Sequence, residues 1–296
     1  MPEPRSAEPV AVEDAVSHRV EGSNHFGGDY VRYWRERVVT APDGTKASTP
    51  QALLHCMDSF DLQGAQTVVD LGCGFGRMLP LLEGEGRRIV GVDISAEMVD
   101  AASHLPYAAV VRGTVEDSRL PSGWADRILC WATFDVAEQE KGFAELHRIL
   151  KPGGLVLLSG KNIDYSETDE AALVAERNAF LKNFPNHFTD VAVVLTNCPG
   201  WGFAVRAAWG YRRRGDMGEN RSFDLLEGND EQYYEYVLLL EKTGICSQVP
   251  DICERSSRTM LRLRDVYEFE GELPKFLAWH KGVFEETFPS EKGGMA

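Results

Sequence analysis

The segment at residues 67–77, TVVDLGCGFGR, constrains the fold more than any other stretch of the chain. It begins with a short apolar run, which is typical of a buried parallel strand. Gly72, Gly74 and Gly76 then alternate with other residues. Because glycine lets the backbone turn sharply and lie close against a ligand, this pattern predicts an α/β protein that binds a ligand at this turn.

An acidic residue stands directly before this turn. Asp70 lies two positions ahead of the first glycine, where a phosphate-binding turn would gain nothing from a carboxylate. The turn therefore predicts a cationic or donor-rich ligand in place of a pyrophosphate. A nicotinamide-dependent oxidoreductase, the alternative in another enzyme class, predicts glycine at Arg77 and an apolar residue at Asp70, and the sequence has neither.

Three later segments extend the strand pattern. Residues 87–95, RRIVGVDIS, end a second apolar run at Asp93, whose carboxylate suits the two hydroxyls of a ribose. Residues 125–131, ADRILCW, predict another strand, and residues 143–160 predict a helix, a Pro-Gly-Gly turn and a further strand at 155–160. Alternation of strand and helix indicates a parallel sheet with helices on both faces.

The motifs DLGCGFGR, VGVDIS and LHRILKPGG, in this order and at these intervals, resemble the class I S-adenosylmethionine-dependent methyltransferases of the small-molecule type. The resemblance covers residues 65–160 and, more weakly, the chain out to residue 242. It implies a Rossmann-like doubly wound sheet, mostly parallel, with inserted helices and a C-terminal extension. It also implies a terminal antiparallel strand pair, which residues 203–213 and 233–242 fit, and S-adenosylmethionine as the cofactor.

The domain organisation follows from the same resemblance. We expect a mobile tail at residues 1–22 and a methyltransferase domain at 23–242, with an insert at about 163–187 that serves as a substrate lid. Residues 243–296 extend beyond the usual end of the family's fold and are expected to form a cap or an oligomer contact, as in a homodimer.

Three helix boundaries are predicted from local signals. A helix at 77–83 follows the glycine turn, and Ser95 is a good N-cap for the helix that ends near Ser103. A helix at 168–184 in the insert is expected to be capped by Thr168.

The resemblance also implies which residues hold the cofactor. The glycine turn binds its amino acid part, the acid before the turn belongs to the network around its ammonium, and the acid after the second strand binds the ribose. Aromatic faces attract sulfonium groups, so tryptophan after the fourth strand is expected to wall the transfer site. The implied residues are Asp70, Gly72, Cys73, Gly74, Gly76, Asp93, Ile94, Met98, Val115, Glu116, Cys130, Trp131, Tyr30 and Tyr33.

Three of these assignments leave alternatives open. Many relatives have an aspartate where this chain has Thr114, so we expect the backbone of Val115 and the carboxylate of Glu116 to meet the adenine, unless Glu116 and Asp117 are only solvated. The aromatic run that contains Tyr30 resembles an N-terminal lid, but residues four apart share a helix face and equally suit an anchor to the core. Met98 equally suits plain helix core.

The sequence offers three candidates for proton transfer. A general base is needed when the acceptor is a hydroxyl that must lose its proton. Asp135 follows the fourth strand, on a loop that commonly meets substrate in the family, and His25 and His187 lie near predicted loops. A single histidine is more often packed or exposed than catalytic, so no residue is an unequivocal base.

The composition narrows the class of acceptor. The net charge of −15 argues against a nucleic-acid substrate, because binding a phosphate backbone relies on a basic surface. The basic run at residues 211–214 is too small to reverse this, although it suits a phosphate or carboxylate on the acceptor or simply balances acidic neighbours.

The remaining bulk features point to a cytoplasmic enzyme. No apolar run reaches the roughly 18 residues of a membrane span, and the first residues do not resemble a signal peptide. The six cysteines form no C-x-x-C pair and no metal-ligand spacing, so we expect reduced thiols and no metal. The main hypothesis is methyl transfer to an O or N nucleophile of a sugar, a nucleotide-sugar or a secondary-metabolite intermediate. The alternative is a catalytically silent, cofactor-binding scaffold subunit.

Overall fold

The computed structural model describes residues 28–39, 51–166, 168–181, 187–228 and 232–247. The expected tail at 1–22, the candidate base His25 and residues 248–296 of the C-terminal segment lie outside these ranges.

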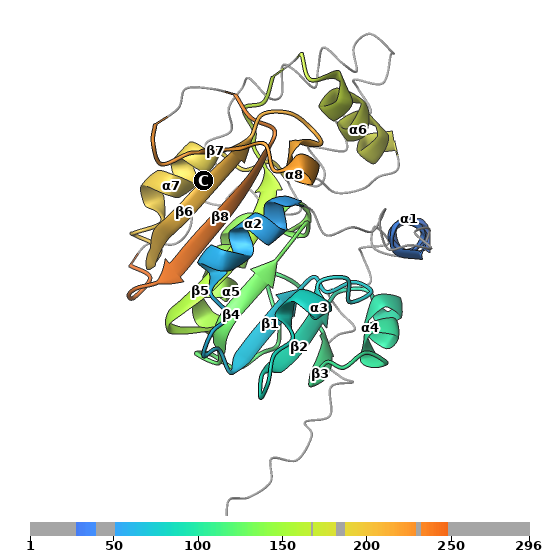
Figure 1. Cartoon of the computed structure of the whole chain (residues 1–296), viewed down its shortest axis with the longest axis vertical. Coiled ribbons are helices and arrows are strands. Elements are labelled where there is room, and N and C mark those ends of the chain that lie inside the picture. Colours follow the sequence, from blue (N-terminus) through green and yellow to red (C-terminus); the bar gives the residue numbers. More distant parts are fainter. Residues whose placement is uncertain (1–27, 40–50, 167, 182–186, 229–231, 248–296) are drawn as a thin grey trace, which may run out of the picture.

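Within these described ranges, one eight-stranded sheet organises the fold, in the order β3-β2-β1-β4-β5-β8-β6-β7 (Figure 1). The first five strands pair in parallel, and β8 runs antiparallel to both β5 and β6, while β7 adds an antiparallel edge. This confirms the predicted mostly parallel, Rossmann-like fold. The strands are β1 (Thr67–Leu71), β2 (Arg88–Asp93), β3 (Ala109–Arg112), β4 (Ala125–Cys130), β5 (Leu150–Lys161), β6 (Phe203–Tyr211), β7 (Ser222–Asp224) and β8 (Glu235–Lys242).

Helices cover both faces of the sheet (Figure 1). Because successive side chains of a strand point to opposite faces, Val68 packs with α2 and α3, whereas its neighbour Val69 packs with α5 and α7. The helices are α1 (Gly28–Val39), α2 (Gln51–Phe60), α3 (Leu79–Leu82), α4 (Ala96–Ser103), α5 (Gln139–Ile149), α6 (Glu170–Leu181), α7 (Val191–Asn197) and α8 (Asp216–Glu219), with a 3₁₀ turn, η2, at Phe134–Val136.

The register of the parallel strands gathers the predicted motifs. Asp70 of β1 pairs with Gly91 of β2 and with Leu129 of β4. The carboxyl ends of these three strands therefore meet at one edge of the sheet, where parallel α/β proteins bind their ligands. This edge carries the glycine turn after β1, Asp93 at the end of β2 and Trp131 after β4.

Two predicted helix boundaries are wrong, and one is confirmed. The chain continues in turns after the glycines, and the short α3 begins only at Leu79, immediately before Pro80. In the insert, Asp169 and not Thr168 caps α6, because its carboxylate accepts the N–H of Ala172 at 3.1 Å. Ser95 caps α4 as predicted, with its side chain accepting the N–H of Met98.

The predicted Pro-Gly-Gly turn proves to be part of a strand. β5 begins at Leu150, directly after α5, and the pairing with β4 shifts register between Ala125 and Arg127. Gly153 has a φ of 75°, and the extra residues of β5 form a bulge opposite β4. The Pro-Gly-Gly segment, predicted as a turn, therefore remains within the strand. Among the described helices, none is long and apolar enough to cross a membrane.

Candidate functional site

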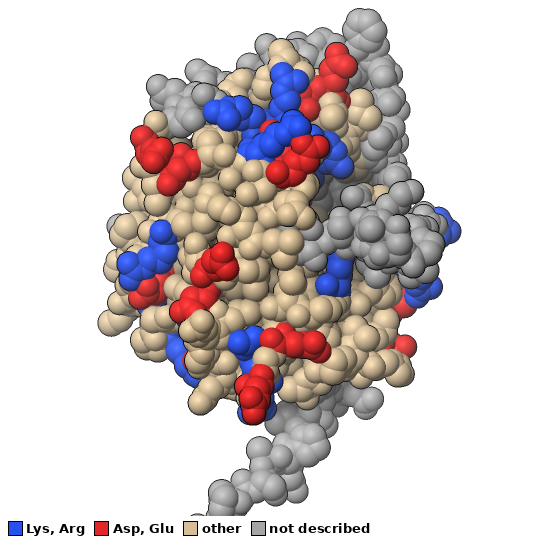
Figure 2. All heavy atoms as spheres, viewed as in Figure 1, with Lys and Arg blue, Asp and Glu red and all other residues tan. Residues whose placement is uncertain are grey.

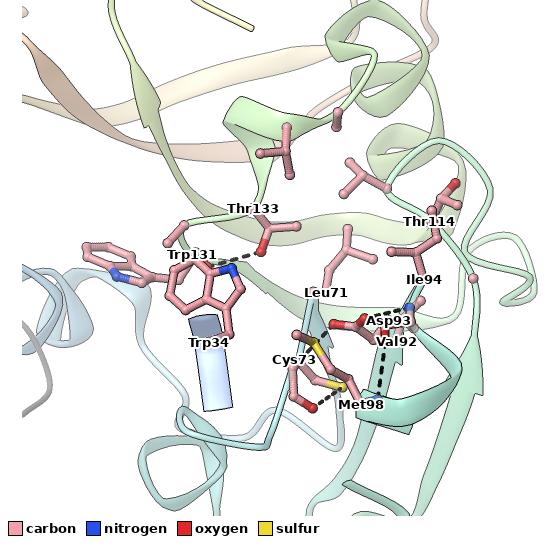
Figure 3. Close-up of a pocket in the computed structure, with 18 of the residues that line it drawn as sticks. Trp34, Leu71, Cys73, Val92, Asp93, Ile94, Met98, Thr114, Trp131 and Thr133 are labelled. Carbon is pink, nitrogen blue, oxygen red and sulfur yellow. Dashed lines mark hydrogen bonds between the residues drawn. The ribbon is translucent and has the colours of Figure 1, made fainter. Parts of the chain in front are cut away.

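A cavity of about 980 Å³, counted with its open mouth, lies at the carboxyl ends of β1, β2 and β4 (Figure 3). The lining comes from α1, the glycine turn, the end of β2, the start of α4, the turn after β3 and the loop after β4. The residues are Tyr30, Trp34, Leu71, Gly72, Cys73, Gly74, Phe75, Arg77, Met78, Val92, Asp93, Ile94, Ser95, Met98, Gly113, Thr114, Val115, Glu116, Trp131, Ala132, Thr133, Val136 and Ala137.

Asp93 is held at the end of β2 by two backbone donors. Its Oδ2 accepts the N–H of Gly74 at 2.8 Å, and its Oδ1 accepts the N–H of Ser95 at 2.9 Å. Burial raises the pKa of this carboxyl, while the two backbone donors act in the opposite direction. Each carboxylate oxygen can accept more than one hydrogen bond, so the fixed group can still receive two hydroxyl donors from the cavity.

The glycine turn packs against the loop after β4. Gly72 has a φ of 79°, and a Cβ built on it would stand 2.2 Å from Oγ1 of Thr133. The N–H groups of Gly72 and Cys73 both donate to the carbonyl of Val92, at 2.7 and 3.0 Å. Only glycine fits the first position, and the turn is thereby fixed across the ends of β2 and β4.

Asp70 lies beneath the turn and not among the lining residues. Its side chain is 2% exposed, and the hydroxyl of Tyr107 donates to its Oδ2 at 2.6 Å. Burial raises the pKa of Asp70 to about 6, although the bond from Tyr107 lowers it. The carboxylate is thus a buried group that a cation at the turn would help to ionise.

The turn after β3 closes another side of the cavity. Val115 and Glu116 line it, and Oε1 of Glu116 accepts the N–H of Glu138 at 2.6 Å. Burial raises the pKa of Glu116. Asp117 is exposed, and its N–H donates to Oγ1 of Thr114 at 3.0 Å, so this threonine shapes the turn.

Aromatic residues from α1 and from the loop after β4 line the cavity together. Tyr30 and Trp34 meet edge to face with ring centroids 6.2 Å apart, and both contribute to the lining with Trp131. Figure 3 shows Trp34 and Trp131 in one part of the cavity, with Asp93 and Met98 in another. The helix that carries Tyr30 and Trp34 therefore covers the ligand site.

A second polar group of residues lies beside this cavity. The ammonium of Lys161, at the end of β5, stands 3.3 Å from Oδ2 of Asp135 and 3.0 Å from Oε1 of Glu176. The backbone N–H of His187 donates to the backbone carbonyl of Asp135 at 2.6 Å. Burial lowers the pKa of the His187 imidazole. Two of the three candidate bases are thus neighbours, and the third, His25, lies outside the described residues.

Most of the predicted cofactor residues come together, and a few do not. Tyr30, Gly72, Cys73, Gly74, Asp93, Ile94, Met98, Val115, Glu116 and Trp131 line the cavity. Asp70, Gly76, Cys130, Tyr33, Asp135 and His187 are not among the lining residues. Gly76 instead accommodates Leu105, whose Cδ1 would stand 2.2 Å from an added Cβ, and Cys130 is fully buried in β4.

The sequence prediction left out lining residues whose signal was weak. Trp34 lies four residues after Tyr30 in the aromatic run. This helical spacing suits a lid over the ligand and an anchor to the core equally well, so the sequence does not distinguish the two roles. Thr133 carries no motif, and only its position opposite Gly72 in the folded chain reveals its contribution.

Comparison with known proteins bears on the same region. Residues 69–158 match a family model described as a methyltransferase domain. Residues 69–158 form a class I S-adenosylmethionine-dependent methyltransferase domain. The chain is 32% identical over 137 residues to an uncharacterized methyltransferase of Mycobacterium tuberculosis. The aligned region covers 46% of this chain and 51% of the relative.

Two further proteins are similar to this chain. A protein of Neonectria named as an S-adenosyl-L-methionine-dependent Diels-Alderase is 27% identical over 159 residues, 52% of this chain and 62% of the relative. The crystal structure of a possible histamine N-methyltransferase from Thermotoga maritima aligns with a TM-score of 0.52 and 18% identity, over 73% of this chain and 98% of that one, and shows the shared fold. The chain spans about half the length of the first curated relatives it matches.

Proposed function

We propose that this protein binds S-adenosylmethionine in the cavity and transfers its methyl group to an O or N nucleophile of a small polar molecule. The observation that carries the proposal is Asp93, whose carboxylate is fixed by two backbone donors at the end of β2 and borders the cavity. A carboxylate at this position suits the two hydroxyls of a ribose.

The other lining residues fit the remaining parts of that cofactor. Ile94 and Met98 offer apolar surface to an adenine, with Val115 and Glu116 at its edge. The glycine turn and the buried Asp70 beneath it suit the amino acid end, since a carboxylate stabilises an ammonium. Trp131 and Trp34 offer aromatic faces to a sulfonium.

The chemistry asks little more of the protein than orientation. S-adenosylmethionine, when bound, supplies a methyl group that its sulfonium has already activated. Holding the acceptor in line with that bond accounts for much of the rate, because a fixed geometry replaces a chance encounter. Asp135 and His187, beside the cavity, are the candidates for orienting an acceptor hydroxyl or receiving its proton.

The surface charge favours a small acceptor over a nucleic acid. Figure 2 shows basic and acidic side chains interspersed on the face that it draws. In the predicted basic run, Arg212 lies 4.6 Å from the ring centroid of Phe223, and nearby Arg221 contacts the carboxylates of Asp216 and Glu219. Arg212 thus contacts an aromatic ring, and Arg221 balances two acidic side chains, which supports local contacts over a phosphate-binding surface.

Cofactor binding and methyl transfer are separate parts of the proposal. The similarity to a protein named as a Diels-Alderase gives a reason to test them separately. A catalytically silent scaffold would also bind the cofactor.

Free thiols at the described cysteines, of which four are buried, support a reducing compartment such as the cytoplasm as the place of action.

The test begins with calorimetric titration of the full chain with S-adenosylmethionine, S-adenosylhomocysteine and, as a control, NAD. We expect micromolar binding of the first two. Asp93→Ala should weaken it roughly a hundredfold, because hydrogen bonds to a charged group contribute about 1.5–3 kcal/mol each. Asp100→Ala, which removes an exposed acid from α4, is the matched control and should leave binding unchanged.

Pools of sugars, nucleotide-sugars and polar metabolites are then screened for release of S-adenosylhomocysteine. Binding without release in any pool would favour the scaffold or another cofactor-dependent reaction. Absence of binding by a folded protein would overturn the proposal altogether.

A further inference from the structure

Lys161 occupies a position that the cofactor does not explain. It is the last residue of β5, and its side chain is 17% exposed. Its ammonium faces one carboxylate from η2 and one from α6, on side chains that are 13% and 3% exposed. A single cation thus joins two elements that are more than 30 residues apart in the chain.

The surroundings of this cation are also polar and buried. The hydroxyl of Tyr234 donates to Oε1 of Glu176, and Nη1 of Arg214 donates to the same hydroxyl at 3.4 Å. Glu235 begins β8 nearby, where burial raises its pKa to about 7. The network therefore contains carboxylates from three elements, with Lys161 between two of them.

The network is the main polar attachment of α6 among its described side chains. α6 buries only Ala172 and Glu176 there, which lie four residues apart and therefore share one face. Ala172 packs with Tyr165 and Tyr234 in a small apolar cluster, against which Leu173 is partly buried. An alanine buries little surface, so the contacts of Glu176 have a large share in fixing this helix.

The other end of the network reaches the cofactor cavity. Asp135 is the middle residue of η2, and the flanking Val136 and Ala137 line the cavity. Tyr30, also in the lining, has its pKa raised mainly by burial, and Asp135, Asp93 and Lys161 all lie close enough to influence it. Asp135 therefore stands between the cavity and the segment under α6.

We propose that Lys161 is a positioning residue, whose ammonium holds Asp135 and the inserted helix α6 in one geometry at the acceptor side of the cavity. This inference rests on the proposed function for its meaning in catalysis. Buried ion pairs contribute little net stability compared with apolar packing, because desolvation offsets the attraction. A pair of this kind is better explained by the geometry that it imposes.

The test is hydrogen exchange of the full chain, read by mass spectrometry with and without S-adenosylhomocysteine. Lys161→Met should speed exchange about tenfold or more in both α6 and residues 134–137, because each segment loses its link to β5. Lys161→Arg should restore most of the protection, since it keeps a cation with directed donors. Glu176→Gln should speed exchange in α6 while leaving residues 134–137 protected.

Lys151→Met is the matched control. Lys151 lies near the start of β5, far along the strand from Lys161, and makes a 2.7 Å ion pair with Asp126 of β4. It should alter neither segment. Faster exchange confined to β5, or an equal effect of Lys151→Met, would overturn the proposal. If Lys161→Met does not fold, Glu176→Gln decides, because unchanged exchange in α6 also contradicts it.

Binding of S-adenosylhomocysteine separates this inference from the proposed function. We expect calorimetric affinity in Lys161→Met to stay within about threefold of the parent, because Lys161 is not among the lining residues. If Lys161→Met binds normally and exchange in α6 and residues 134–137 is unchanged, the role of Lys161 is rejected and the proposed function stands. Absence of binding in the parent protein would reject the proposed function instead.

Discussion

The two sides of the cavity are built by different means. On the cofactor side, backbone groups do most of the positioning: glycines at positive φ, N–H donors to Asp93 and a carbonyl of β2 that receives two N–H groups. On the side of η2 and α6, which we propose as the acceptor side, side chains meet across distant elements, as at Lys161, Asp135 and Glu176. A backbone site depends on few residue types, whereas a side-chain network can change with the acceptor.

The largest effect expected from this comparison is at Gly72. Gly72→Ala should abolish measurable binding of S-adenosylhomocysteine and lower the free energy of unfolding by about 2–4 kcal/mol, because the methyl group meets Thr133 and φ stays positive. Gly86→Ala separates the two causes. That glycine also has a positive φ but open space around it, so it should cost only about 1–2 kcal/mol and leave binding intact.

Asp70 tests whether a side chain on the cofactor side is retained for binding at the expense of stability. The pKa of Asp70 is about 6 in the folded protein, against about 3.9 for an unfolded aspartate. Because the unfolded chain loses this proton first, the free energy of unfolding falls as the pH rises from about 4 to 6. Asp70→Asn should remove this part of the pH dependence and add about 1–3 kcal/mol to the free energy of unfolding at pH 7. It should also weaken S-adenosylhomocysteine binding about tenfold.

Denaturant titrations of parent and variant across this pH range give the difference directly, and calorimetry at pH 7 gives the affinity. Equal stability profiles for the two proteins would mean that Asp70 is not held at a raised pKa. Unchanged affinity would separate it from the ammonium of the cofactor.

On the acceptor side, Tyr234 tests the contribution of a side-chain hydrogen bond. Tyr234→Phe should lower the free energy of unfolding by about 1–2 kcal/mol, because a buried hydroxyl that serves Glu176 and Arg214 is lost. The neighbouring Tyr233→Phe should change it by less than about 0.5 kcal/mol. Both are measured by denaturant unfolding, with S-adenosylhomocysteine affinity unchanged in each. Similar costs at the two tyrosines would contradict a specific role for the network.

The smallest effect is expected where a side chain supplements the backbone on the cofactor side. Glu116→Ala should weaken S-adenosylhomocysteine binding about three- to fivefold, because an acceptor at the adenine edge is lost. Asp117→Ala should change binding by less than about twofold, since Asp117 is exposed. A larger effect at Asp117 would reverse the assignment of the adenine edge.

Local sequence patterns were sufficient to predict the strands and the turn on the glycine-turn side of the cavity. The apolar runs, the alternating glycines and the acid at the end of β2 predicted strands, a turn and a carboxylate whose roles depend on the nearest residues, so short-range chemistry fixed them. The cap at Ser95 followed for the same reason. The boundary errors at α3 and α6 arose where adjacent residues, such as Thr168 and Asp169, have similar capping ability.

Contacts between distant segments were decided only by the tertiary structure. Tyr107 meets Asp70 across 37 residues, Thr133 faces Gly72, and Lys161 joins Asp135 to Glu176. Tyr107, Thr133 and Lys161 carry no motif, because each is selected by its partner in space and not by its neighbours in the chain. The sequence by itself therefore determined the α/β architecture and most of the predicted residues that line the cavity. The folded sheet decided the side-chain network beside the cavity, since it alone brings the ends of β4 and β5 together with α6.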